Sequence, residues 1–297
     1  MFEVLDYAFM QRALLAALLI GIAAPAVGIY LVQRRQALMG DGIGHVALTG
    51  VALGFWLSTN PVWMAVAVSA VGAVAMELLR SSGRARGDVA LAMLFYGGMA
   101  GGVMIINLAP GGSTANLTSY LWGSVTTVSP EDITAILVLS GFVLAVCLGL
   151  RRQLFAVCQD EEFARVTGLP VRALNLLLAV TAAATVTVAM RVVGLLLVSA
   201  LMVIPVVAAQ QLTRGFAATL ALAVLGGVLV SVSGTVTSYY QDVPPGATIV
   251  LIALGLFLLV SLLALPLSRR RAAAAERTPD GDVKAGRHLA TEPDTVR

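Results

Sequence analysis

Two side chains that can hold a metal ion or a proton lie four residues apart near the start of an apolar stretch of this sequence. They are Asp41 and His45, and glycines occupy positions 40, 42 and 44 around them. Residues four apart share one face of a helix, so a helical segment would point the carboxylate and the imidazole the same way. Ionisable groups are costly in hydrocarbon, and divalent transition metals accept both ligand types. The pair therefore indicates metal or proton handling.

A purely structural interpretation of the same pair stays open. Asp41 would then be an acidic residue at a helix start, favoured there by the helix dipole, and His45 would be hydrogen-bonded to a neighbour. The glycines would serve close helix packing. Only one other histidine, His288 near the end of the sequence, occurs, and no cysteine lies close to the pair. Because a tetrahedral site needs about four ligands, one chain alone cannot build one here.

The composition is that of a membrane protein. Of 297 residues, 59% are hydrophobic and 12% are charged, whereas soluble domains carry about 25% charged residues. Apolar runs of about 20 residues recur, each long enough to cross a bilayer as a helix. They are continuous rather than alternating, which argues against a β-barrel. We therefore expect an all-α fold, a polytopic transmembrane helical bundle.

Nine membrane helices are predicted. Their ranges are 7–32, 43–57, 62–79, 89–108, 133–150, 174–190, 192–212, 216–235 and 248–267. Arg191 interrupts the pattern between the sixth and the seventh. If these two form one bent span with a broken helix, the number of crossings is eight.

The arginines predict the orientation of the bundle. They follow the first, third, fifth, seventh and ninth segments, and the positive-inside rule places those ends in the cytoplasm. We expect a multi-pass protein of the cytoplasmic membrane with its N-terminus outside and its C-terminus inside. Arg191 lies on an outward turn and breaks the rule, so we expect its side chain, like that of Arg12, to extend to the membrane interface. Residues 1–268 form the membrane domain, and 269–297 are predicted to be a disordered cytoplasmic tail.

A polar connection at about 159–171 lies on the predicted cytoplasmic side. It has the length of one short helix, with Asp160, Glu161 and Glu162 at its start, where negative charge is favourable. Gly168 and Pro170 end it. It is either a solvated amphipathic connector or a docking helix for a cytoplasmic partner.

Two further features bear on function. The predicted outer loop 238–246 contains Asp242 beside two prolines and a glycine; it is a tight turn, and Asp242 could also attract a cation at an outer entrance. The sole lysine, Lys284, lies in the tail, so no phosphate-binding Gly-x-x-x-x-Gly-Lys-Ser/Thr loop exists. Any hydrolysis of nucleotide must therefore occur on another chain.

Four blocks of the sequence carry a family resemblance. They are 31–35 with 40–54, 160–171, 191–201 with Pro205, and 238–246. In this order they resemble the membrane permeases of zinc- and manganese-importing ABC transporters, over residues 5–268. One departure is Ile43-Gly44, where the family usually has Leu-Ser before the histidine, so a hydroxyl is lost.

The resemblance implies a homodimeric pore, two cytoplasmic ATPase subunits and an extracytoplasmic metal-binding protein. It places Asp41 and His45 in the translocation path, and Asp242 stays a further candidate from its position in the predicted outer loop. It also marks the residues that couple to the ATPase, namely Asp160, Glu161, Glu162, Phe163, Ala164 and Gly168. The chain would be a transport subunit rather than an enzyme. It would carry zinc, manganese or iron as a substrate and hold no permanent cofactor.

Two rival functions stay open. The first is a permease for iron chelates or a cobalamin-type cofactor in a related ABC system. The second is a proton-coupled carrier, in which Asp41 and His45 would relay protons.

Overall fold

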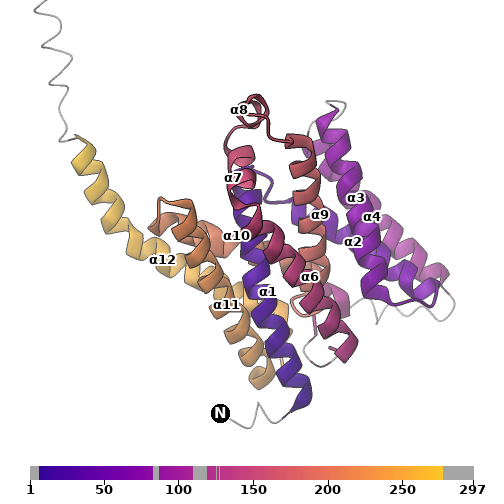
Figure 1. Cartoon of the computed structure of the whole chain (residues 1–297). Helices are drawn as coiled ribbons and strands as arrows, with labels where there is room; N and C mark the ends of the chain where they lie inside the picture. Colours follow the sequence, from indigo (N-terminus) through magenta and orange to yellow (C-terminus); the bar gives the residue numbers. More distant parts are fainter. Residues whose placement is uncertain (1–6, 83–86, 110–118, 125, 127, 277–297) are drawn as a thin grey trace, which may run out of the picture.

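Helices account for the regular structure of this chain. The structure is a computed structural model that describes residues 7–82, 87–109, 119–124, 126 and 128–276, and no strand occurs within those ranges. The helices, shown in Figure 1, are α1 (Ala8–Gln33), α2 (Met39–Trp56), α3 (Pro61–Ser81), α4 (Gly87–Leu108), α6 (Pro130–Gly149), α7 (Arg151–Gln159), α8 (Glu161–Val166), α9 (Val171–Ala189), α10 (Leu195–Leu212), α11 (Phe216–Gln241) and α12 (Pro245–Glu276).

The predicted all-α membrane bundle is confirmed. Within the described residues, seven helices are long and apolar enough to span a bilayer: α1, α3, α4, α6, α9, α11 and α12. α10 contributes a shorter apolar stretch, Leu197–Leu212. α2 carries the Asp41–His45 pair and is not one of these seven, so the described residues hold seven long spans where nine were predicted. α9 and α10 are separate helices, as the nine-helix interpretation predicts.

Local sequence signals explain where several helices begin and end. Asn60 caps α3 by accepting a hydrogen bond from the Val62 amide at 3.0 Å, and Pro61 takes the first helical position, where its missing N–H costs nothing. Ser129 and Asp132 form a reciprocal capping box at the start of α6, which satisfies backbone donors that a helix start leaves open.

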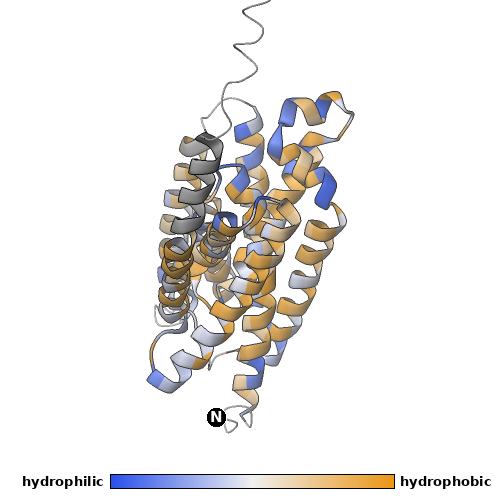
Figure 2. Cartoon of the chain, turned by 90° about the vertical axis from the view of Figure 1, so that its left-hand side faces the viewer, coloured by the Kyte–Doolittle hydropathy of each residue, from blue (hydrophilic) through white to orange (hydrophobic). Residues whose placement is uncertain are grey.

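The core of the bundle is built around α1. This helix contacts α6, α9, α10 and α11 and is buried along most of its length. α12 is exposed along most of its apolar stretch. Figure 2 shows hydrophobic residues through the middle of the helices and hydrophilic residues gathered toward their ends. An apolar belt of this kind suits helices surrounded by lipid.

The arginine-bearing helix ends meet at one end of the bundle. Arg34, after α1, and Arg80, in α3, both pair with Glu161 of α8, and α8 lies at the end opposite the start of α1 (Figure 1). The arginines Arg34 and Arg80, which predicted the orientation of the bundle, therefore lie close together at one end of it. α12 continues to Glu276, past the predicted boundary at 268. Residues 277–297, with His288 and Lys284, lie outside the described residues.

Arg191 does not extend to the membrane interface, and that expectation was wrong. Its guanidinium is largely buried, pairs with Asp132 at the start of α6, and lies 4.8 Å from the centre of the Tyr120 ring. A buried carboxylate partner neutralises it inside the protein, so it has no need of lipid headgroups. Arg12 is half-buried and donates a hydrogen bond to the Ala8 carbonyl at 3.2 Å.

Candidate functional site

The two residues singled out from the sequence lie in the first turns of α2, on the helical spacing that was predicted. Asp41 is in the first turn and is half-buried, whereas His45 is one turn further along and only 7% exposed. The helix starts at Met39 rather than at Ile43. Asp41 is therefore inside the helix, where the N-terminal end of the dipole stabilises its negative charge.

The glycines around the pair allow neighbouring helices to approach closely. A Cβ atom at position 40 would lie 2.7 Å from Ser199 Oγ of α10, and one at position 42 would lie 2.6 Å from Leu91 Cδ1 of α4. Gly44 packs against Leu195 in the same way. The packing role of the glycines is thus real, and it places α10 and α4 on either side of the pair.

Helix α4 forms the wall that faces His45. The Phe95 ring lies 4.2 Å from the imidazole, centre to centre, with the planes inclined at 67°. The Thr49 hydroxyl donates a hydrogen bond of 2.6 Å to the Gly98 carbonyl, which joins α2 to α4 one turn beyond His45. Phe95 therefore fixes one side of the imidazole and shields it from polar neighbours.

Asp41 lines a pocket between the start of α2 and α4. The pocket has a volume of about 300 Å³. Its other lining residues are Leu38, Leu91, Ala92, Phe95 and Tyr96. Asp41 is the one charged side chain among them, so the pocket offers a carboxylate against an apolar and aromatic wall. Such a surface attracts a cation and gives it few permanent contacts.

His45 has a buried polar atom that nothing in the described residues satisfies. Its Nδ1 has no hydrogen-bond partner there, and neither has the buried Ser199 hydroxyl opposite Gly40. Buried polar atoms are nearly always paired, so an unpaired one calls for an explanation. Within the described residues no group of three or more His, Cys, Asp or Glu side chains could hold a metal ion. In that part of the chain, Asp41 and His45 offer two side chains of types that bind metal ions, without a closed cage around them.

Asp242 lies far from this pair. It ends α11 in a left-handed conformation, with φ 50°, and is exposed. Nearby Tyr239 contacts Phe9 at the start of α1, whereas Asp41 follows the end of that 26-residue helix. Because a helix rises 1.5 Å per residue, about 39 Å of α1 separates the two ends. The structure does not bring Asp242 together with Asp41 and His45.

The polar connection at 159–171 contains one short helix, α8, as predicted, and the additional helix α7 precedes it. Asp160 caps α8 by accepting from the amides of Glu162 and Phe163 at 2.9 and 3.0 Å. Gly168, with φ 84°, follows α8, as predicted for its end. Ala164 is fully buried, whereas Phe163 and Val166 are 65% and 86% exposed. This short helix therefore presents an apolar surface away from the bundle.

Sequence reasoning missed the groups that surround both regions. Phe95, Leu195 and Ser199 gave no signal, because an aromatic or small residue in an apolar run usually marks packing alone. The partners of Glu161, which are Arg34, Arg80 and Asn175, were also missed. Glu77 and Arg80, three residues apart in α3, form a two-pronged ion pair with contacts of 2.7 and 2.8 Å.

Comparison with known proteins gives one consistent family. A sequence model described as the ABC 3 transport family matches residues 6–264. The chain is 33% identical over 257 residues to the manganese transport system membrane protein MntC of Halalkalibacterium halodurans, covering 86% of this chain and 88% of that protein. It is also 33% identical over 261 residues to the chelated iron transport system membrane protein YfeD of Yersinia pestis, covering 88% and 87%.

A solved structure agrees with the sequence comparison. The fold resembles a chain in the structure of PsaBC from Streptococcus pneumoniae in complex with Fab, with a TM-score of 0.78 and 29% identity. The match covers 87% of this chain and 94% of that one. The similarity therefore extends over the whole helical bundle.

Proposed function

Because this chain belongs to the ABC 3 transport family and is the membrane permease subunit of a metal-importing ABC transporter, we propose that Asp41 and His45 bind the divalent metal ion during its passage. The observation that carries this proposal is the unpaired, buried Nδ1 of His45. It lies one helical turn from the carboxylate that lines the pocket against α4. A neutral imidazole and a carboxylate are both ligands for zinc, manganese and iron.

Two ligands per chain suit transport better than storage. An ion must bind strongly enough to enter and weakly enough to leave, so a deep binding well would trap it. In a homodimer with the two copies of α2 facing the same path, four side chains would be offered to the ion. The proposal therefore includes a homodimeric pore, in which coordination is shared and brief.

The two ends of the bundle would bind different partners. The end with α8 would face the cytoplasm, and the exposed Phe163 and Val166 would dock a separate ATPase subunit. The opposite end, with Asp242 and the start of α1, would receive the metal from an extracytoplasmic binding protein. This orientation places the N-terminus outside and the C-terminus inside, as the arginines predict.

Uptake of Mn²⁺ and Zn²⁺ into vesicles tests the site. The vesicles contain the permease with its ATPase and are supplied with the binding protein, and the variants are Asp41→Ala and His45→Ala. We expect both to lose uptake at least about tenfold, because changing even a residue that supports a metal ligand costs about 10–100-fold in affinity or activity. Asp242→Ala serves as the comparison, and we expect a smaller loss. Normal uptake by both α2 variants, at normal abundance, would remove the pair from the mechanism.

A second candidate function is import of an iron chelate, favoured by the similarity to YfeD. A chelate enters with its iron already coordinated, so it needs a wide path and no protein ligands. Competition separates the two functions. If the ion passes naked, free Mn²⁺ should compete with free Zn²⁺ for uptake. If the chelate is the substrate, neither free ion should reduce uptake of the iron chelate.

A further inference from the structure

One carboxylate oxygen joins the short helix α8 to three other helices. Glu161 Oε1 accepts hydrogen bonds from the guanidinium of Arg34, from Arg80 Nη2 at 3.3 Å and from Asn175 Nδ2 at 3.2 Å. Arg34 ends α1, Arg80 is in the last turn of α3, and Asn175 is in α9. The first residue of α8 is thereby fastened to the membrane bundle.

The partners of Glu161 are also bound to one another. Arg34 Nη1 donates to Asn175 Oδ1 at 2.8 Å, and Arg80 makes a two-pronged pair with Glu77 at 2.7 and 2.8 Å. Two guanidinium groups thus balance two carboxylates. The Arg34 side chain is only 6% exposed, whereas that of Glu161 is 35% exposed. Removal of the Glu161 charge would leave a buried cation without its counterion, which is strongly unfavourable.

The two faces of α8 differ in what they contact. Glu161 and the buried Ala164 face the bundle, whereas Phe163 and Val166 face outward. The next residue, Glu162, has the same charge as Glu161 and is exposed. A force applied to the outward face therefore reaches the bundle through the Glu161 contacts rather than through Glu162.

A short connection leads from Arg34 to the Asp41–His45 pair. Residues 34–38 join α1 to α2, and this turn is held by hydrogen bonds from the Gln36 amide to the Leu31 carbonyl at 2.8 Å and from the Met39 amide to the Gln36 carbonyl at 2.9 Å. Asp41 is in the first turn of the helix that follows. A shift of Arg34 would therefore move the start of α2.

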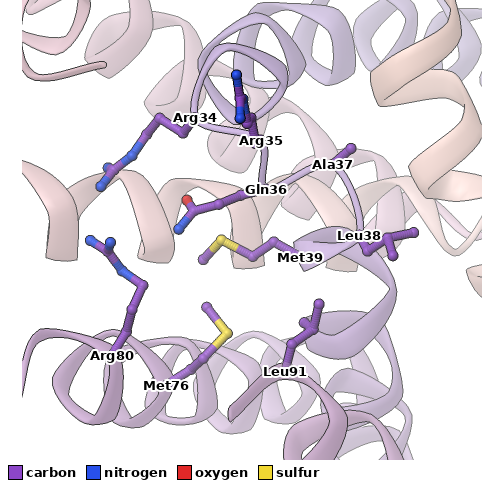
Figure 3. A pocket seen from close by; sticks show the side chains of 9 residues that line it. All are labelled: Arg34, Arg35, Gln36, Ala37, Leu38, Met39, Met76, Arg80 and Leu91. Atoms are coloured by element: carbon purple, nitrogen blue, oxygen red, sulfur yellow. The ribbon is translucent and has the colours of Figure 1, made fainter. Parts of the chain in front are cut away.

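The space next to this connection allows such a shift. A pocket of about 360 Å³ lies beneath it, lined by Arg34, Met39, Met76, Arg80 and five other residues. Figure 3 shows the Arg34 and Arg80 side chains reaching toward the same side, with the flexible side chains of Met39 and Met76 between their helices. Methionine side chains adapt readily to changes in packing, so the connection can move without displacing a rigid core.

We propose that Glu161 is a positioning residue that fastens α8 to α1, α3 and α9, so that movement of α8 shifts the start of α2 and changes the Asp41–His45 site. The inference rests on the proposed function, in which an ATPase drives α8. It assigns to Glu161 a role separate from docking. Phe163 and Val166 bind the ATPase, and Glu161 passes the movement on.

The test compares Glu161→Gln with Glu162→Gln in the complete complex of permease, ATPase and binding protein in vesicles. The readout is Mn²⁺ taken up per ATP hydrolysed. We expect Glu161→Gln to assemble with the ATPase and to hydrolyse ATP, with the ratio reduced about tenfold, because hydrogen bonds to a charged group are lost. Glu162→Gln should keep the wild-type ratio. Equal ratios for the two variants, or loss of the ATPase from Glu161→Gln alone, would overturn the proposal.

A second pair of variants protects the test against a folding defect. Arg34→Lys keeps the positive charge but cannot bind Glu161 and Asn175 together through a planar fork. Arg35→Lys is the control at the neighbouring, exposed position. We expect a reduced ratio for Arg34→Lys alone, and identical behaviour of the two would contradict the proposal. Suppose that Asp41→Ala and His45→Ala abolish uptake, whereas Glu161→Gln and Arg34→Lys keep the wild-type ratio of Mn²⁺ to ATP. The proposed function would then stand, and the role of Glu161 would fail.

Discussion

Gly98 of α4 lies directly against the backbone of His45 in α2. A Cβ atom at position 98 would come within 2.6 Å of the His45 carbonyl carbon and of the Val46 amide nitrogen. The two helices therefore touch backbone to backbone beside the candidate site. Small residues at helix interfaces permit this kind of packing in membranes.

Replacing Gly98 with alanine should push α4 away from His45. Overpacking costs about 1–3 kcal/mol, so we expect a lower unfolding temperature in detergent and reduced Mn²⁺ uptake. Gly97→Ala is a matched control, because a Cβ atom at position 97 meets nothing within 4 Å. Equal effects of the two substitutions would show that the close approach at Gly98 is unimportant.

Cys158 should react slowly with alkylating reagents at neutral pH. Burial in α7 disfavours the thiolate and raises the pKa of this thiol from 9.0 to about 11, against a lowering by nearby Arg34 and with a smaller raising contribution from Glu161. At pH 8 the pH is three units below a pKa of 11 but only one unit below a pKa of 9. The fraction of Cys158 present as thiolate is therefore about a hundredfold smaller than for an unperturbed cysteine, and the alkylation rate depends on that fraction.

The measurement is the rate of labelling by iodoacetamide as a function of pH in the native protein. The rate should keep rising to about pH 11, since the raised pKa keeps the thiol protonated until then. The other cysteine, Cys147, is fully buried, so Cys147→Ser should leave the profile unchanged and Cys158→Ser should abolish labelling. A plateau already at pH 9 would contradict the prediction.

The buried pair of Arg191 and Asp132 should matter for stability. Removing one partner of a buried ion pair costs about 3–5 kcal/mol. We expect Asp132→Ala to lower the unfolding temperature markedly, whereas Glu131→Ala, at the exposed neighbouring position, should change it little. Asp132→Ala combined with Arg191→Ala should be less damaging than the sum of the single changes. Strict additivity would show that the two groups act independently.

The outward face of α8 should determine how firmly the ATPase is held. Val166→Asp places a charge on an apolar surface, and we expect about tenfold weaker association, the size of effect of losing one central contact. Co-purification of the ATPase with the permease measures it. Trp56→Ala changes another exposed apolar residue, at the end of α2 away from α8, and should have no effect. Unchanged retention by Val166→Asp would exclude this surface as the docking site.

The amino-acid sequence predicted the helices well because each depends on local features. Apolar runs set the spans, and residues such as Asn60 and Gly168 mark helix boundaries. The spacing of Asp41 and His45 placed them correctly on one face. Contacts between distant segments could not be predicted, since the neighbours of His45 and Glu161 depend on how helices pack. Arg191 shows the difference, because its partner Asp132 is 59 positions away and nothing in the local sequence reveals it.

The backbone contact between α2 and α4 has a consequence for any cycle of opening and closing. With no side chain between Gly98 and His45, no rotamer change can let these two helices slide past each other. They must travel as one rigid unit, carrying the carboxylate and its aromatic wall together. Rearrangement would then occur on the other side of α2, where Leu195, Ser199 and Met202 of α10 meet its glycines through side chains that can rotate.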